Sequence, residues 1–389
     1  MAASDAKETA RARVERARDE LIALSHRIHG APELAFEEER ACAWLTELLA
    51  GAGLQVETGV GDLPTAFAAR AGAGQLHVVV CAEYDALPGV GHACGHNLIA
   101  AMATGAGIAL AEVADDLGLT VTVLGTPAEE GGGGKILLLR QGAFAGAHAA
   151  MMVHPSPYEV PEMPIIAVTQ LRVAYTGKEA HASAYPHLGV NAADALVVAQ
   201  TAIGLLRQHL LPGDRVHGIV THGGDAPNVV PGHTAGTWMV RAATLEQLGA
   251  VRAKVTRCFE AGALATGAAL EIAEDHDPYA EMHHDHELAA VYRRNAEALG
   301  RRFDERPDRG AGSTDMGNVS LALPSIHPTI GIDALPAVNH QPAFTAKCVT
   351  PAADRAVVDG AVAMAWTAID AATDRQLRSR LLAGPTSAG

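Results

Sequence analysis

The chain has 389 residues, with 29 Lys and Arg against 44 Asp and Glu, which gives a formal net charge of −15. Such an acidic chain is a poor ligand for nucleic acids, and no run approaches the ~20 apolar residues that cross a bilayer. Its five cysteines are odd in number and scattered, which argues against a disulfide framework. We therefore expect a cytoplasmic protein without nucleic-acid or membrane partners, and the length suggests two domains.

The first part of the chain alternates helical and strand patterns. We predict helices over 5–29, 36–50 and 98–113 and from about residue 135, and strands over 55–57, 65–70, 77–81, 119–124 and 147–153. Apolar strands alternating with helices are typical of an α/β domain whose strand ends carry functional groups. The expected fold is therefore α/β, with a doubly wound mixed sheet.

The pattern changes near residue 168. Strands and helices now follow in the order β-α-β-β-α-β, over 168–176, 192–209, 216–221, 233–241, 245–265 and 269–273. This order is typical of a ferredoxin-like domain, here inserted into the first domain. The first domain then resumes, with a helix, a strand and a helix over 286–299, 329–332 and 352–372. The predicted boundaries are 1–168 and 278–389 for the first domain and 169–277 for the inserted one.

The strand predicted over 77–81 leads into a loop with candidate metal ligands. The stretch 77–97 reads HVVVCAEYDALPGVGHACGHN. The thiol of Cys94 and the imidazole of His96 are ligands that transition metals accept. The alternative is a small buried cysteine beside an ordinary helix cap, and this loop alone does not separate the two.

Further candidate ligands follow the next two predicted strands. Glu129 and Glu130 come after the first of them, and His154 comes after the second. Strand ends of a doubly wound sheet line one rim, so these side chains and Cys94 should meet there. His340, on a late loop, can complete the set. Thiolate, imidazole and carboxylate donors in this number suffice for two divalent ions, either zinc or manganese.

The adjacent pair Glu129 and Glu130 suggests a division of labour. On an extended chain the two side chains point in opposite directions, so one can bind metal while the other faces the substrate. The second can then act as a general base for a metal-bound water. The alternative is a pair of acidic residues that the helix dipole favours near a helix N-terminus.

Two other patterns have simpler explanations. The run GGGGK, residues 131–135, lacks the spacing of a phosphate-binding loop. The histidine-rich cluster at 283–286 opens a charged helix and is typical of a solvated helix start. A third possibility, Cys94 as a nucleophile with His96 as its base, lacks a separate orienting group.

The inserted domain carries weaker signals. His181 lies in a loop of small residues, and a single histidine is usually structural. Asn228 and Arg241 are unremarkable when taken singly, although Arg241 could bind a substrate carboxylate through two hydrogen bonds.

Together these motifs resemble the amidohydrolase branch of peptidase family M20, dinuclear metallopeptidases that include hippurate hydrolase and auxin-conjugate amidohydrolases. The matching segments are GHACGHN (91–97), GTPAEEGGGGK (125–135), MVHP (152–155), GKEAHASAYP (177–186), PNVVPG (227–232), GSTDMGN (312–318) and NHQPAF (339–344). Within the branch, EYDALPGVGHACGHN and GSTDMGNVS are similar to one of the subunits of p-aminobenzoyl-glutamate hydrolase and to β-alanyl-lysine-type dipeptidases. The resemblance implies a metal-dependent hydrolase of N-acyl amino acids or dipeptide-like substrates, with the inserted domain as lid and dimerisation domain.

The resemblance also implies a role for each motif residue. Two divalent ions per subunit would be held by Cys94 as the bridge, His96, Glu130, His154 and His340. Glu129 would be the general base for a metal-bridged water, and His181 would stabilise the oxyanion in the partner subunit of a homodimer. The carboxylate end of the substrate would be held by Asn228, Arg241, Gly312, Ser313 and Thr314. Asp85 would orient the site from behind the ligands.

One residue departs from the pattern of the branch. Many members have Asp after CGH, whereas this chain has Asn97, and the lost charge could alter metal preference or substrate acceptance. Two alternatives to a dipeptidase stay open. One is a hydrolase of p-aminobenzoyl-glutamate or another N-acyl amino acid. The other is a non-catalytic protein that binds metal and a carboxylate, although such a protein would need neither Glu129 nor His181.

Overall fold

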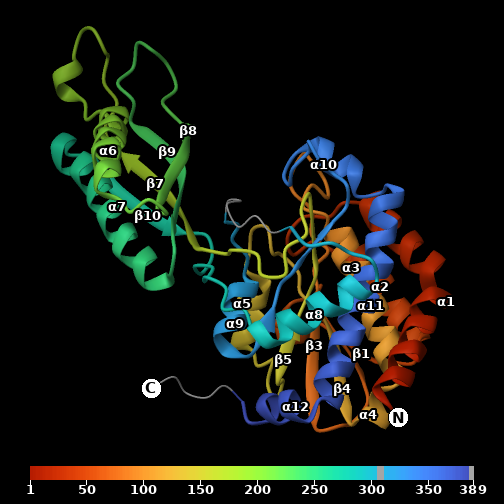
Figure 1. The fold of residues 1–389 in the computed structure, drawn as a ribbon. Helices are drawn as coiled ribbons and strands as arrows, with labels where there is room; N and C mark the ends of the chain where they lie inside the picture. Colours follow the sequence, from red (N-terminus) through yellow and green to blue (C-terminus); the bar gives the residue numbers. More distant parts are fainter. Residues whose placement is uncertain (305–310, 385–389) are drawn as a thin grey trace. The chain divides into compact units, whose positions relative to one another are not determined.

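The computed structural model describes residues 1–304 and 311–384, which form two compact units (Figure 1). Unit 1 comprises Met1–Pro164 and Met282–Gly389, and unit 2 comprises Ile165–Glu281. The predicted boundaries, after residues 168 and 277, both fall inside unit 2. A bridge between Val168 and Tyr279 joins the entering and leaving segments of unit 2.

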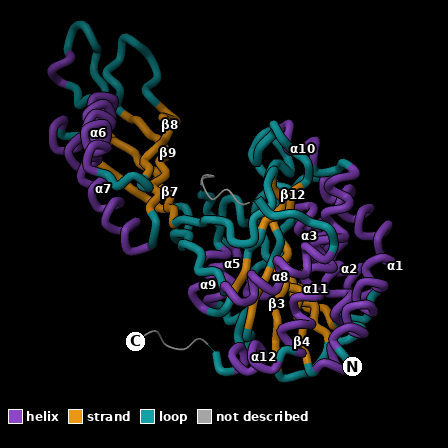
Figure 2. The backbone as a smooth tube through the Cα atoms, in the orientation of Figure 1, coloured by secondary structure: helices purple, strands orange, loops and turns teal. Residues whose placement is uncertain are grey.

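Unit 1 is built on a mixed sheet, as the sequence predicted (Figure 2). The sheet has six strands, of which the one at 325–326 was not predicted. Its order is β1-β2-β4-β3-β5-β11, with bounds β1 Gln55–Thr58, β2 Phe67–Ala71, β3 Leu76–Ala82, β4 Leu119–Gly125, β5 Ala149–Met151 and β11 Ser325–Ile326. β3 pairs in parallel with β4 and β5, whereas β2 is antiparallel to β4. The side chains of β3 and β4 are mostly buried, because helices cover the sheet. A separate two-stranded sheet pairs β6 His154–Ser156 with β12 Thr329–Gly331.

The helices of unit 1 lie on both sides of this sheet. Figure 1 shows α1, α2, α3 and α11 on one side and α5 and α9 on the other. Their bounds are α1 Ala3–His29, α2 Glu39–Gly51, α3 His96–Ala111, α4 Ala114–Leu117, α5 Gly134–Arg140, α8 His286–Ala298, α9 Met316–Ala322, α10 Pro342–Lys347, α11 Pro351–Thr373 and α12 Arg375–Leu382. α3 is buried over nearly its whole length, which explains why its sequence has no polar face. The short helices α4, α9, α10 and α12 were not predicted.

α11 shows how length and composition can mislead. The sequence suggested no run that could cross a bilayer, yet within the described residues α11 is the one helix long and apolar enough to do so. Most of α11 is buried in the hydrophobic core of unit 1. A core helix of a globular protein passes the same test, so α11 is weak evidence for a membrane span.

Unit 2 is a four-stranded antiparallel sheet with two long helices. The sheet order is β10-β7-β9-β8, with bounds β7 Ala167–Thr176, β8 Arg215–His222, β9 His233–Ala242 and β10 Ala269–Glu274. α6 Ala192–Leu206 and α7 Leu245–Thr266 contribute to a separate hydrophobic core with Tyr175, Trp238 and Phe259. Asn191 caps α6 and Thr244 caps α7, each accepting backbone N–H bonds from the first turn.

Candidate metal centre and active site

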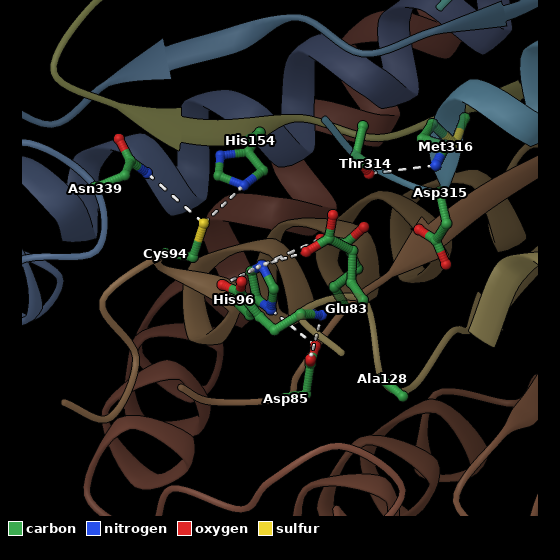
Figure 3. Close-up of polar contacts among 12 residues, drawn as sticks. Glu83, Asp85, Cys94, His96, Ala128, His154, Thr314, Asp315, Met316 and Asn339 are labelled. Atoms are coloured by element: carbon green, nitrogen blue, oxygen red, sulfur yellow. Dashed lines mark hydrogen bonds and ion pairs between the residues drawn. The ribbon is translucent and has the colours of Figure 1, made fainter. Parts of the chain in front are cut away.

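Three loops that follow β3, β4 and β5 meet at one rim of the unit 1 sheet (Figure 3). The loop after β3 carries Cys94 and His96, the loop after β4 carries the two glutamates, and His154 follows β5. Because these three strands run parallel to one another, their carboxyl ends lie side by side. The structure therefore brings these residues together at the predicted edge.

Backbone conformation explains how the Cys94 loop approaches β6. Gly95 has φ = 80°, a left-handed conformation that glycine adopts without strain, and α3 begins at the next residue. A Cβ atom at position 95 would lie 2.4 Å from Cγ of Pro155, so no larger residue fits. From the other side, the N–H of His340 donates to the carbonyl of Ala93 at 2.8 Å. These contacts fix the late loop against the Cys94 loop.

The sulfur of Cys94 lies at the centre of the ligand cluster. Cys94 Sγ is 3.5 Å from Nε2 of His154 and 3.6 Å from Nε2 of His340. His340 Nε2 in turn lies 3.7 Å from Oε2 of Glu130. Two groups able to hold a metal ion share this sulfur, Cys94 with His96 and His154, and Cys94 with Glu130 and His340. Within each group the ligand atoms lie within 4.8 Å of one another.

His96 is oriented by a buried carboxylate. Its Nδ1 forms a hydrogen bond with Oδ1 of Asp85 at 2.9 Å, which leaves Nε2 as the nitrogen free to bind metal. Among the described residues, His96 Nε2 and Glu130 Oε1 are buried and have no hydrogen-bond partner. Buried polar atoms without partners are costly, and a cation between them would remove that cost. The donor set therefore fits a metal centre.

Burial shapes the charge of the cluster. Burial, followed by the nearby charges of Glu83 and Glu130, raises the pKa of Glu129 well above its usual range. Burial likewise raises the pKa of the Cys94 thiol and lowers that of His154 to about 4. His154 is thus neutral at pH 7, the form that binds metal. Cations in the cluster would favour the ionised carboxylates and thiolate, so metal binding would release protons.

The two glutamates lie in a turn and not on extended chain, so the expected alternation of their side chains does not apply. Glu129 Oε2 and Glu130 Oε1 each lie 3.8 Å from Nε2 of His96. Glu129 also groups with His96 and Glu83, whereas Glu130 groups with Cys94 and His340. The two carboxylates therefore have different neighbours because of the tertiary structure, and the local backbone conformation does not explain the difference.

A buried ion cluster that was not predicted from the sequence lies beside the ligands. Lys135 Nζ contacts Glu83 Oε1 and lies 2.7 Å from Asp315 Oδ1, and all three side chains are fully buried. The other oxygen of Glu83 lies 3.4 Å from Nε2 of His96. Asn339, also not predicted, donates from Nδ2 to the carbonyl of Pro155 at 3.3 Å. The sequence offered one signal for the ion cluster, which is the charged residue Glu83 directly after an apolar strand and shortly before Asp85.

Asn97 has a clear structural role. It is fully buried, and its Nδ2 donates to Ser25 Oγ at 2.9 Å and to the carbonyl of Cys348 at 3.2 Å. A carboxylate cannot donate, so an aspartate here would face the carbonyl oxygen of Cys348. The residue after His96 is therefore set by the local packing of α3 against α1 and the loop before α11.

The residues predicted to bind substrate are distributed over both units. In unit 1, the N–H of Gly312 donates to the carbonyl of Pro164, Ser313 follows it, and Thr314 Oγ1 accepts the N–H of Met316 at the start of α9. In unit 2, His181 and Asn228 lie on exposed loops and Arg241 lies on β9.

His181 has a defined hydrogen-bonding state. Its Nδ1 accepts the backbone N–H groups of Ser183 and Ala184 at 3.3 and 3.2 Å. Two N–H groups directed at Nδ1 favour the tautomer that carries its proton on Nε2. The carbonyl of Asn228 accepts the N–H of Ala182 at 3.0 Å, which holds the two loops of unit 2 together.

A mixed α/β sheet with a cluster of candidate metal ligands at its rim is an arrangement suited to a metal-dependent hydrolase. Residues 79–356 match Peptidase family M20/M25/M40, and the chain belongs to this family. It is 42% identical over 384 residues to the Xaa-Arg dipeptidase of Mus musculus, covering 94% of this chain and 88% of that protein. It is 32% identical to one of the subunits of p-aminobenzoyl-glutamate hydrolase from Escherichia coli, covering 66% of this chain and 58% of that one.

Solved structures share the fold. An aminobenzoyl-glutamate utilization protein from Klebsiella pneumoniae has a TM-score of 0.73 at 18% identity, covering 93% of this chain and 97% of that one. A dinuclear metal binding peptidase of the M20 family from Bacillus subtilis has a TM-score of 0.69 at 22% identity, covering 91% and 99%. The chain is thus a hydrolase of peptide or amide bonds, as the sequence predicted, and the family's metal dependence agrees with the ligand groups.

Proposed function

We propose that this protein is a dipeptidase with two divalent metal ions, zinc or manganese, in each subunit. The observation that carries the proposal is the position of Cys94 Sγ in both ligand groups, which suits a bridging thiolate. One ion would be held by Cys94, His96 and His154, and the other by Cys94, Glu130 and His340. Thiolate favours zinc, whereas the carboxylate and imidazoles accept either metal.

Glu129 is the general base of the proposed reaction. Bound metal ions supply Lewis-acid stabilisation of developing negative charge and make a water more acidic. Glu129 accepts the proton of the attacking water and then returns it to the amine of the leaving amino acid. The position of Glu129 supports both steps, because its carboxylate is buried beside the ligand cluster and Oε2 lies 3.8 Å from Nε2 of His96.

Unit 2 is proposed to be the ferredoxin-like lid and dimerisation domain. Its element order and its sheet order β10-β7-β9-β8 support this assignment. His181 then serves the active site of the partner subunit, where its Nε2–H donates to the oxyanion of the tetrahedral intermediate. The two backbone bonds to Nδ1 support this role, because they keep Nε2 as the donor.

The proposed substrate is a dipeptide with a C-terminal basic residue, by analogy with the Xaa-Arg dipeptidases of Mus musculus and Homo sapiens. Its carboxylate would be held by Asn228, Arg241, Gly312, Ser313 and Thr314. A p-aminobenzoyl-glutamate or other N-acyl-amino-acid hydrolase is the second candidate, favoured by the match to the Escherichia coli p-aminobenzoyl-glutamate hydrolase. The five cysteines are all free, which supports a reducing, cytoplasmic location.

A substrate panel tests the proposal. The apoprotein would be loaded with zinc or manganese and assayed on dipeptides ending in Arg, Lys, Ala or Glu, on N-acetyl amino acids and on p-aminobenzoyl-glutamate. We expect the highest kcat/KM for a dipeptide ending in Arg or Lys. A preference for p-aminobenzoyl-glutamate would favour the second candidate. A metal-loaded protein that hydrolyses none of these would support the non-catalytic alternative.

Mixing two inactive variants tests the trans action of His181. Glu129→Ala and His181→Ala homodimers would each be nearly inactive. If His181 serves the partner's site, a heterodimer has one site with both groups intact. Random exchange should then restore up to about one quarter of the wild-type activity per subunit, because half of the dimers are mixed. No recovery after verified subunit exchange would contradict the trans role.

A further inference from the structure

Glu38 is a buried carboxylate with no part in the metal cluster. It is fully buried at the start of α2, far in sequence from the glutamate loop. Its Oε1 accepts the backbone N–H of Phe36 at 3.0 Å and that of Ala128 at 2.9 Å. Its Oε2 accepts the hydroxyl of Thr65 at 2.8 Å. Each of these three bonds comes from a loop, and one of the loops carries Glu129.

Ala128 needs such an anchor. Its φ is 60°, in the left-handed region that residues with a Cβ disfavour. Its carbonyl accepts the N–H groups of Gly132 and Gly133 at 3.0 and 2.9 Å, so this conformation closes the turn that carries Glu129. Phe36 packs against the same turn, because a Cβ at Gly132 would lie 2.3 Å from its ring.

The backbone on the other side of Glu129 is held in the same way. The N–H of Glu130 donates to Oδ2 of Asp85 at 2.9 Å. Oδ1 of the same carboxylate forms a hydrogen bond with Nδ1 of His96 (Figure 3). Two buried carboxylates therefore hold the N–H groups of the residues that flank Glu129. Asp85 secures the metal-binding side, and Glu38 secures the other side.

We propose that Glu38 is a positioning residue for the general base, which it aims by holding Ala128 in its left-handed conformation. The inference rests on the proposed function of Glu129. Glu38 touches neither substrate nor metal in this scheme. It acts through the backbone of Ala128, so its loss should lower turnover and leave the metal ligands in place.

Three substitutions at position 38 distinguish the effect of its hydrogen bonds to the backbone from the effects of its charge and of its packing. In Glu38→Ala the anchor is lost, and we expect kcat to fall at least ~10-fold with KM changed less than ~3-fold and metal content unchanged. In Glu38→Asp the carboxylate is one methylene shorter and should also lose kcat. In Glu38→Gln the amide oxygen can still accept both N–H groups and the amide nitrogen can donate to Thr65, so kcat should stay within ~3-fold of wild type.

Two further variants make the test specific. Asp370→Ala removes a carboxylate of α11 that accepts from Lys7 and Asn295, so it should lower the Tm and leave kcat unchanged. Adding Ala128→Gly to Glu38→Ala should recover part of the lost kcat, because glycine adopts the left-handed conformation without the anchor. Hydrogen–deuterium exchange over 126–134 should be faster in Glu38→Ala and near wild type in Glu38→Gln.

The outcomes are distinguishable. Wild-type kcat in Glu38→Ala, measured well below its Tm, would overturn the inference while leaving the proposed function intact. Equal loss in Glu38→Gln and Glu38→Ala would also overturn it, because the charge and not the anchor would then matter. If Glu38→Ala does not fold, the contrast between Glu38→Asp and Glu38→Gln decides. A wild-type protein inactive across the substrate panel would instead refute the proposed function, and the exchange measurement would still test the anchor.

Discussion

Two clusters of buried charge lie next to each other in unit 1, and they differ in how their charges are compensated. In the first, Lys135 lies between Glu83 and Asp315 and neutralises much of their charge. In the second, Cys94, Glu130 and three histidines converge, and atoms such as His96 Nε2 are buried without a hydrogen-bond partner among the described residues. Glu83 joins the two, with one oxygen on Lys135 and the other facing His96.

The comparison separates a buried cluster whose charge the chain itself compensates from one whose donors fit a metal ion. Removing charges from water is costly, and a lysine in the first cluster offsets that cost from within the chain. In the described part of the chain, the Glu130 carboxylate pairs with His96 and His340 and not with a lysine or arginine, so the donors of the second cluster are suited to cations from outside. Three experiments test this distinction, and a fourth tests the packing of Asn97 beside the second cluster.

Metal removal should have the largest effect. Exhaustive chelation should abolish hydrolysis, because the second cluster then lacks its charge compensation and its Lewis acid. It should also lower the Tm, since ligands that bind only the folded state stabilise it. Zinc or manganese added back should restore both activity and Tm. Activity that persists in metal-free protein would instead favour Cys94 as a nucleophile.

Lys135→Met should destabilise the fold by about 3–5 kcal/mol, because Glu83 and Asp315 would stay buried without their cation. Urea denaturation measures this change. The exposed Lys178→Met in unit 2 is the matched control and should change stability by less than about 0.5 kcal/mol. Adding Asp315→Asn to Lys135→Met should recover part of the loss. A loss as small as that of the control would show that the first cluster is not structural.

Glu129→Ala should lower kcat by at least ~10²-fold, the scale of lost acid–base help, and should keep the metal content. The neighbouring Glu130→Ala is the control, because it should lose metal together with activity. Elemental analysis and steady-state kinetics measure both effects. Unchanged turnover in Glu129→Ala would refute the mechanism, and loss of metal from it would place Glu129 among the ligands.

Asn97→Asp should have the smallest effect, a loss of stability of about 1–3 kcal/mol at pH 7, because a buried carboxylate would face the carbonyl of Cys348. Burial would raise the folded pKa of this aspartate above its unfolded value of about 3.9. The stability of Asn97→Asp should therefore be highest below the unfolded pKa of about 3.9, and it should fall as the pH rises through the folded pKa. Asn97→Ala, which adds no charge, should lose stability equally at pH 5 and pH 8. A pH-independent loss in Asn97→Asp would contradict this explanation.

Local patterns in the sequence determined much of the fold. Alternating apolar runs and caps placed β3, β4, β7, β9, α6 and α7 within a few residues of their observed bounds, because side-chain periodicity follows directly from backbone geometry. Spacing after the strands also identified Cys94, Glu130 and His154 as neighbours, because parallel strands end at one rim. Short elements such as α9 and α12 carry too little periodicity and were missed.

The tertiary structure alone decided how the buried charges pair. Nothing local in the sequence indicated that Lys135 neutralises Glu83 and Asp315, or that Glu38 holds Ala128, because these partners lie 52, 180 and 90 residues apart. The same is true of Asn97, whose amide matches carbonyl and hydroxyl groups from α1 and the loop before α11. Strand ends follow from periodicity along the chain, whereas charge compensation depends on distances that only folding sets.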